Sequence, residues 1–137
     1  MTASLLMLIS VTIVALLGTG HLALTFVGPK LLPRDRSLRE AMEKVSPVIT
    51  TRTTIWRAWL GFNASHSMGA ILFGLVYGYL AVAQSDVLFQ SIFLQTVGFV
   101  MLAGYFVLAW RYWFVTPFAG ITLSLICYVG SIGATWL

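Results

Sequence analysis

Hydrophobic positions along the chain form four long runs, which are separated by short polar segments. The runs cover residues 4–27, 55–83, 87–110 and 114–137. Each run reaches the roughly 20 residues that a helix needs to cross a hydrocarbon core of about 30 Å. Lipid offers the backbone no hydrogen-bond partner, so such runs are expected to be helical. The pattern predicts an all-α fold with a single transmembrane domain, an antiparallel up-and-down four-helix bundle.

The largest polar interruption, residues 28–54, is predicted to contain a short helix of its own. Ser37 and Glu40 have the spacing of a capping box at a helix start. Apolar residues then recur on one helical face: Leu38, Ala41, Met42 and Val45. This pattern predicts an amphipathic helix over about residues 38–45, lying at the membrane interface. The next polar segment, residues 84–86, is predicted to be a tight turn.

Basic residues predict the orientation of the chain, because cytoplasmic loops retain Lys and Arg during insertion. Six of the eight lie in the 28–54 loop, while Arg57 and Arg111 fall on the same side, and the opposite turn holds Asp86. The loop is therefore predicted to be cytoplasmic, with both termini outside the plasma membrane. Arg52, Arg57 and Arg111 are predicted to bind anionic lipid headgroups or another anion there. This assignment of the charge makes a nucleic-acid partner unexpected.

Composition supports a membrane protein and narrows the chemistry. The chain is 59% hydrophobic and 9% charged, whereas soluble domains carry about 25% charged residues. Its single cysteine, Cys127, excludes an intramolecular disulfide and CxxC-based chemistry. All four acidic residues lie outside the spans, so neither a metal site nor ion-coupled transport is expected. Enzymatic activity stays open, but a non-catalytic role is favoured.

Polar residues inside the spans form the candidate site. Asn63, His66 and Ser67 in the second run follow the i, i+3, i+4 spacing of one helical face, which is expected to contact protein rather than lipid. Gln95 lies near the middle of the third run. His21, toward the inner end of the first run, lies at a depth similar to that of His66, so the two imidazoles could meet.

Three interpretations of these residues remain open. His21 and His66 could be the axial ligands of a b-type haem in an electron-transfer protein. Asn63, His66, Ser67 and Gln95 could line a small pore for a neutral or anionic solute, while the two histidines could instead relay protons. Each histidine could instead bond a neighbouring polar side chain and join the first two spans. The haem interpretation is tested by looking for a Soret band in the purified protein. The pore interpretation is tested by measuring solute flux into liposomes.

A ridge of small residues leads to the favoured functional hypothesis. Gly61, Ser65 and Gly69 recur every four residues, which is the spacing through which membrane helices approach closely. With little mass outside the spans, the chain is interpreted as a non-catalytic subunit. It would form a homo-oligomer or belong to a larger membrane complex.

The stretch from Trp56 to Gly69, together with Gly20-His21-Leu22, resembles an uncharacterised family of small four-span bacterial membrane proteins. The resemblance implies a protein of the bacterial inner membrane and indicates no substrate or cofactor.

Overall fold

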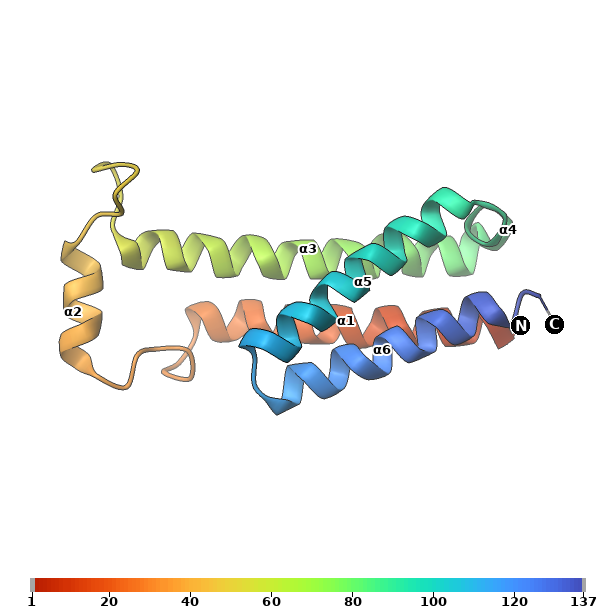
Figure 1. Cartoon of the computed structure of the whole chain (residues 1–137), viewed down its shortest axis with the longest axis horizontal. Helices are drawn as coiled ribbons and strands as arrows, with labels where there is room; N and C mark the ends of the chain where they lie inside the picture. Colours follow the sequence, from red (N-terminus) through yellow and green to blue (C-terminus); the bar gives the residue numbers. More distant parts are fainter. Residues whose placement is uncertain (1, 137) are drawn as a thin grey trace. The chain divides into compact units, whose positions relative to one another are not determined.

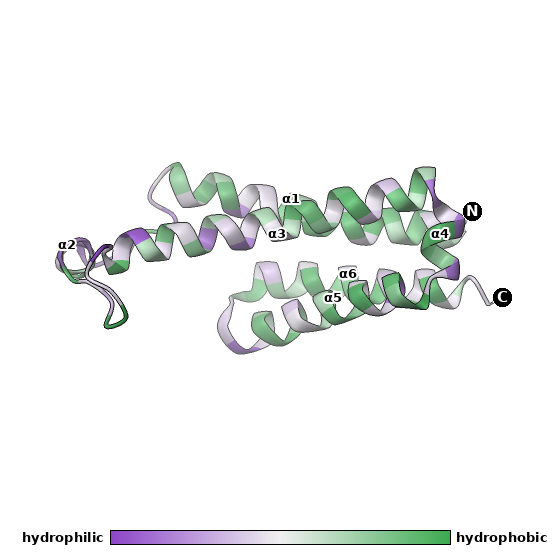
Figure 2. Cartoon of the chain, turned by 90° about the horizontal axis from the view of Figure 1, so that it is seen from above, coloured by the Kyte–Doolittle hydropathy of each residue, from purple (hydrophilic) through white to green (hydrophobic). Residues whose placement is uncertain are grey.

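A computed structural model describes residues 2–136, which form six helices and no strand (Figure 1). The helices are α1 (Thr2–Phe26), α2 (Arg36–Lys44), α3 (Ile55–Ala83), α4 (Ser85–Gln90), α5 (Ile92–Tyr112) and α6 (Val115–Gly133). Four of them, α1, α3, α5 and α6, are long and apolar enough to cross a membrane, and hydrophobic colouring predominates along them in Figure 2. The prediction of an all-helical chain with four potential spans is confirmed.

The third long helix begins later than the predicted apolar run. Residues 84–86 do not form a simple turn, because Ser85 and Asp86 begin the separate helix α4, and α5 starts only at Ile92. Ser91 separates the two helices: its backbone is extended, and its side chain accepts a hydrogen bond from the Leu94 amide at 3.3 Å. A serine in this N-cap conformation satisfies an amide at the start of α5 and ends α4.

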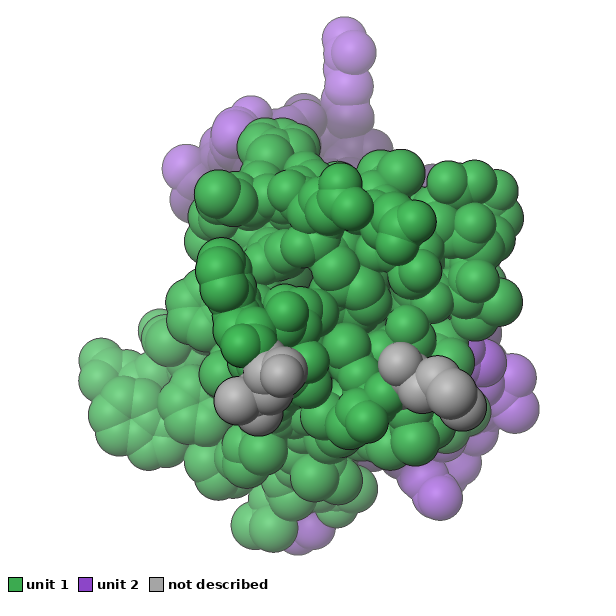
Figure 3. Space-filling model, turned by 90° about the vertical axis from the view of Figure 1, so that its right-hand side faces the viewer, with its two compact units in different colours: residues 1–17, 70–137 green, residues 18–69 purple. Residues whose placement is uncertain are grey.

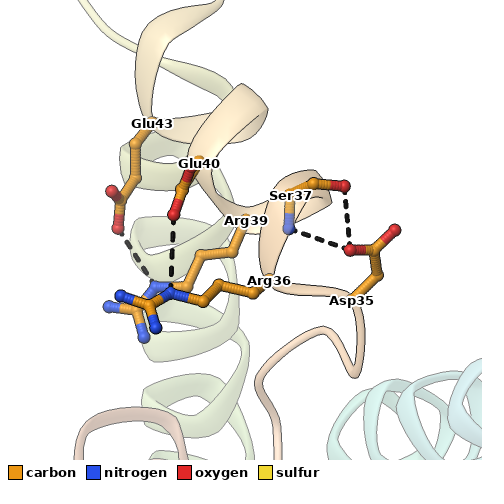
Figure 4. Close-up of polar contacts among 6 residues, drawn as sticks. All are labelled: Asp35, Arg36, Ser37, Arg39, Glu40 and Glu43. Atoms are coloured by element: carbon orange, nitrogen blue, oxygen red, sulfur yellow. Dashed lines mark hydrogen bonds and ion pairs between the residues drawn. The ribbon is translucent and has the colours of Figure 1, made fainter.

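The predicted capping box of the loop helix is also wrong. Asp35, not Ser37, is the N-cap of α2, and its carboxylate accepts bonds from the Ser37 amide and hydroxyl, each at 2.8 Å (Figure 4). The hydrogen bond from the Ser37 hydroxyl, and to a smaller extent the one from the Ser37 amide, lowers the pKa of the Asp35 carboxyl. Glu40 pairs with Arg36 at 3.4 Å instead of returning to the cap. The helix therefore begins two residues before the predicted start.

The ends of the spanning helices beside this loop have local causes. Helix α1 ends at Phe26, and Gly28 then adopts a φ of +84°, a conformation that glycine accepts without steric cost. Pro29 follows directly and cannot continue the helix. At the other end of the loop, the Thr54 hydroxyl oxygen accepts a bond from the Arg57 amide at 3.3 Å and so caps the start of α3.

The chain divides into two compact units (Figure 3). Unit 1 comprises Met1–Leu17 and Ala70–Leu137, and unit 2 comprises Gly18–Gly69. Both α1 and α3 therefore contribute to each unit. Unit 2 contains the polar loop with α2, whereas unit 1 contains α4, α5 and α6.

Buried serines join α1 to α6 inside unit 1. The Ser124 hydroxyl donates to the Ser10 carbonyl at 3.0 Å, so the Ser10 hydroxyl donates to the Ser124 oxygen at 2.9 Å. The Ser131 hydroxyl donates to the Ala3 carbonyl at 2.7 Å. Residue numbers rise along one helix as they fall along the other, so these two segments run in opposite directions. Hydroxyl bonds of this kind hold helices together where lipid removes the usual hydrophobic drive.

Two buried tyrosines surround Gly98 in the same unit. The Tyr77 hydroxyl donates to the Leu94 carbonyl at 2.7 Å, and the Tyr128 hydroxyl donates to the Gln95 carbonyl at 2.8 Å. A Cβ at Gly98 would lie 2.8 Å from the Tyr77 ring and would also collide with the Tyr128 hydroxyl. The absence of a side chain here lets both phenols reach the backbone of α5.

Candidate functional site

The two histidines meet within unit 2. His21 lies in the last two turns of α1, and His66 lies in the first half of α3. Their ring centroids are 5.7 Å apart, and their planes meet at 89°, so the contact is edge to face. Both residues are half-buried.

Asn63 determines how His21 is hydrogen-bonded. Its Nδ2 donates to the Trp59 carbonyl one turn earlier at 2.8 Å, so its Oδ1 is directed at His21. The distance from Oδ1 to His21 Nε2 is 2.9 Å. An amide oxygen can only accept, so His21 Nε2 carries the hydrogen, and in the neutral ring the lone pair resides on Nδ1. The amide thus selects the His21 tautomer and links α1 to α3.

Two further hydroxyls belong to the polar cluster, and each bonds a carbonyl of its own helix. The Ser67 hydroxyl donates to the Asn63 carbonyl at 2.9 Å, and Ser67 is fully buried. The Thr25 hydroxyl donates to the His21 carbonyl at 2.7 Å. Such bonds to the preceding turn satisfy hydroxyls in an apolar environment. Asn63, Ser67 and His21 therefore use polar groups on one another or on their own helices.

Gln95, the fourth residue of the predicted polar stripe, belongs to unit 1. Its Nε2 donates to the Phe89 carbonyl at 2.7 Å, across the break at Ser91. That carbonyl lies near the end of α4, where helical partners for carbonyl groups run out. The side chain thus serves the junction between α4 and α5.

In this arrangement His21 Nε2 is not free to ligate a haem iron, because it is bonded to Asn63. Axial ligation needs a ring-nitrogen lone pair from each histidine, and in neutral His21 that lone pair lies on Nδ1, because Nε2 donates its hydrogen to Asn63. Asn63 lies one turn before His66 on α3 and occupies the position that His21 Nε2 faces. For metals, residues 2–136 contain no group of three or more His, Cys, Asp or Glu side chains arranged to hold an ion.

The three arginines of the predicted headgroup site are all exposed. Arg52 lies in the loop before α3, and Arg57 lies in the first turn of α3; both belong to unit 2. Arg111 lies in the last turn of α5, in unit 1.

Arg39 is a residue that sequence reasoning did not single out. Its guanidinium carbon lies 5.1 Å from the centroid of the Trp56 ring, and its Nε donates to Glu43 at 3.1 Å (Figure 4). Trp56 stacks on Trp59 with centroids 5.1 Å apart, and the Trp59 carbonyl accepts from Asn63. A chain of contacts therefore runs from α2 to the histidine pair. The only signal in the sequence for this Arg39–Trp56 contact was that several arginines lie close to a helix start rich in tryptophan.

The first two residues of the ridge on α3 are exposed, whereas Gly69 is half-buried. Gly61 and Ser65 are exposed, and nothing lies within 4 Å of a Cβ built at Gly61. The neighbouring Phe62 and Met68 are 75% and 63% exposed. Gly74, farther along the same helix, is different, because a Cβ there would lie 2.7 Å from the Ala15 Cβ. One glycine of α3 thus serves packing within the chain, while Gly61 faces outward.

Comparison of the chain with family models, curated proteins and solved structures gives no match.

Proposed function

We propose that the chain is a non-catalytic subunit of a membrane assembly. It packs through the α3 ridge, Gly61, Ser65 and Gly69, against a second copy or against another membrane protein. The observation that carries the proposal is the open space at Gly61 beside the exposed Phe62 and Met68. Small residues at this spacing let two helix backbones approach, and large neighbours then pack around the contact.

The polar cluster supports a structural role better than a pore or a catalytic role. Asn63 bonds both His21 and the Trp59 carbonyl, and the Ser67 hydroxyl bonds the Asn63 carbonyl. A pore lining would present such groups to water and solute. Here the bonds join α1 to α3 and stabilise the helix that carries the ridge.

The proposed placement is a bacterial inner membrane, with four spans forming an antiparallel up-and-down bundle. Both termini lie outside, and the loop between α1 and α3 lies in the cytoplasm. Helix α2 is proposed to lie at the inner interface, while Arg52, Arg57 and Arg111 contact anionic headgroups. Support comes from the positive charges, which would all fall on one side of such a bundle.

Native mass spectrometry of the gently extracted protein tests the subunit role. We expect the wild type to be released as an assembly larger than one chain. Gly61→Ile places a branched side chain on the ridge and is expected to shift most of the protein to the monomer. Gly104→Ile is the matched control, because Gly104 is also exposed, with nothing within 4 Å of its Cβ position.

The control is expected to keep the wild-type assembly. The proposal fails if the wild type is monomeric under every gentle extraction. It also fails if Gly61→Ile and Gly104→Ile retain the assembly equally.

A further inference from the structure

The segment between α2 and α3 is a closed loop with a defined turn at its tip. The Ile55 amide donates to the Val45 carbonyl at 2.8 Å, which brings the two ends of the loop together. At the tip, the Thr50 amide donates to the Pro47 carbonyl at 3.2 Å. The Thr50 hydroxyl oxygen then accepts from the Arg52 amide at 3.1 Å. The loop is therefore built as a turn, with Val48 and Ile49 at its two central positions.

Those two central residues are the most exposed large hydrophobic side chains among the described residues. Val48 has a relative exposure of 109%, and Ile49 has one of 91%. Central turn positions usually carry polar residues or glycine. Two β-branched apolar residues held outward at a turn need an apolar environment that the chain itself does not supply.

The position of the tip indicates which environment that is. Within unit 2, the loop projects sideways from the start of α3, and its tip carries hydrophobic colouring (Figures 1 and 2). The start of α3 is where a spanning helix enters the bilayer, and Trp56 and Trp59 in its first turns are residues typical of the interface. A tip extending sideways from that level meets lipid.

The charges around the tip favour the same environment. Lys44 and Arg52 flank the turn on either side and are exposed. The acidic residues of α2 are paired with its own arginines, Glu40 with Arg36 and Glu43 with Arg39. Apolar insertion flanked by exposed basic residues matches the chemistry of an anionic leaflet, with acyl chains below and phosphates above.

We propose that Val48 and Ile49 insert into the bilayer leaflet that faces the loop, with Lys44 and Arg52 at the level of the lipid phosphates. The apolar side chains Leu38 and Val45 of the adjoining segment, which are 51% and 56% exposed, contact the same interface. The loop is thus a lipid anchor at the cytoplasmic end of α3. This inference rests on the proposed membrane placement but not on the subunit role, so the two can fail separately.

Spin labels measure the insertion directly. In a Cys127→Ser background, Val48→Cys and Ile49→Cys are labelled and reconstituted in vesicles of phosphatidylcholine and phosphatidylglycerol. Power saturation then compares collisions with oxygen, which concentrates in lipid, and with a water-soluble nickel chelate. We expect the oxygen-to-nickel ratio at both tip positions to be severalfold higher than at Lys30→Cys, an exposed position between α1 and α2.

Circular dichroism of each labelled protein verifies that the helices are retained. A ratio at the tip equal to that at Lys30→Cys would place the turn in water and overturn the proposal. A ratio that rises only after native membrane proteins are added to the vesicles would also overturn it, because the occupant would then be a protein.

Discussion

Asn63 makes one contact within α3 and one with α1. Its amide hydrogen satisfies the Trp59 carbonyl within α3, while its oxygen accepts from His21 on α1. An asparagine inside a span finds no partner in lipid, so its bonds must lie within protein. The residue therefore both connects two helices and determines the tautomer of His21.

Replacing Asn63 by leucine is expected to destabilise the protein by about 1–2 kcal/mol. The change keeps the volume but leaves His21 Nε2–H without its acceptor, and single interhelical bonds in membranes contribute about 0.6 kcal/mol, rising to about 1.7 kcal/mol. Unfolding in mixed detergent and dodecyl sulfate, followed by circular dichroism, measures the difference. Thr122→Ala is the control, since the Thr122 hydroxyl bonds the Phe118 carbonyl of its own helix at 2.8 Å. Equal stability of the two variants would contradict the role given to Asn63.

At the scale of elements, α5 shows how one helix uses glycine in two ways. Gly98 is buried under the rings of Tyr77 and Tyr128, whereas Gly104, less than two turns later, is exposed. The first is required by the close approach of other helices in unit 1. No helix approaches Gly104 closely within the described contacts, so helix propensity alone decides how a substitution there changes stability.

Gly98→Ala is therefore expected to lower the stability of the protein, whereas Gly104→Ala is not. A methyl group at Gly98 forces the phenol rings away from α5, an overpacking that costs about 1–3 kcal/mol. A methyl group at Gly104 meets open space and is expected to leave stability unchanged or raise it by up to about 1 kcal/mol through helix propensity. The same dodecyl sulfate titration measures both. A loss at Gly104 as large as that at Gly98 would show that packing is not the cause.

At the scale of the whole molecule, the proposed orientation of the chain can be tested by cysteine accessibility. Asp86→Cys in α4 and Arg34→Cys in the basic loop replace exposed residues on opposite predicted sides. In a Cys127→Ser background, an impermeant maleimide is expected to label position 86 in intact cells and position 34 only in inverted vesicles. The basic residues are the physical reason, because they resist translocation. The reverse labelling pattern, or labelling of both positions in intact cells, would refute the orientation.

The sequence alone was sufficient to predict the helical class and the four potential spans. Apolar runs of this length leave the backbone no hydrogen-bond partner except itself, so hydropathy is a reliable guide to helices in lipid. It also placed His21 and His66 at similar depth, since rise per residue is constant along a helix. It was less reliable where short side chains compete for the backbone, and so it missed the cap at Asp35 and the break at Ser91.

Tertiary structure decided which of these residues meet and what each one bonds. Periodicity assigns a residue to a face of its own helix, but not to a partner on another. The bond from His21 to Asn63, the position of Arg39 over Trp56 and the crowding at Gly98 all depend on contacts between distant segments. The same holds for exposure. The sequence does not distinguish Gly61 from Gly74 on α3, but packing leaves Gly61 open and places Gly74 against Ala15 of α1. The sequence therefore determined the helices, because lipid constrains each backbone separately, whereas the fold decided the pairings, because those depend on shape.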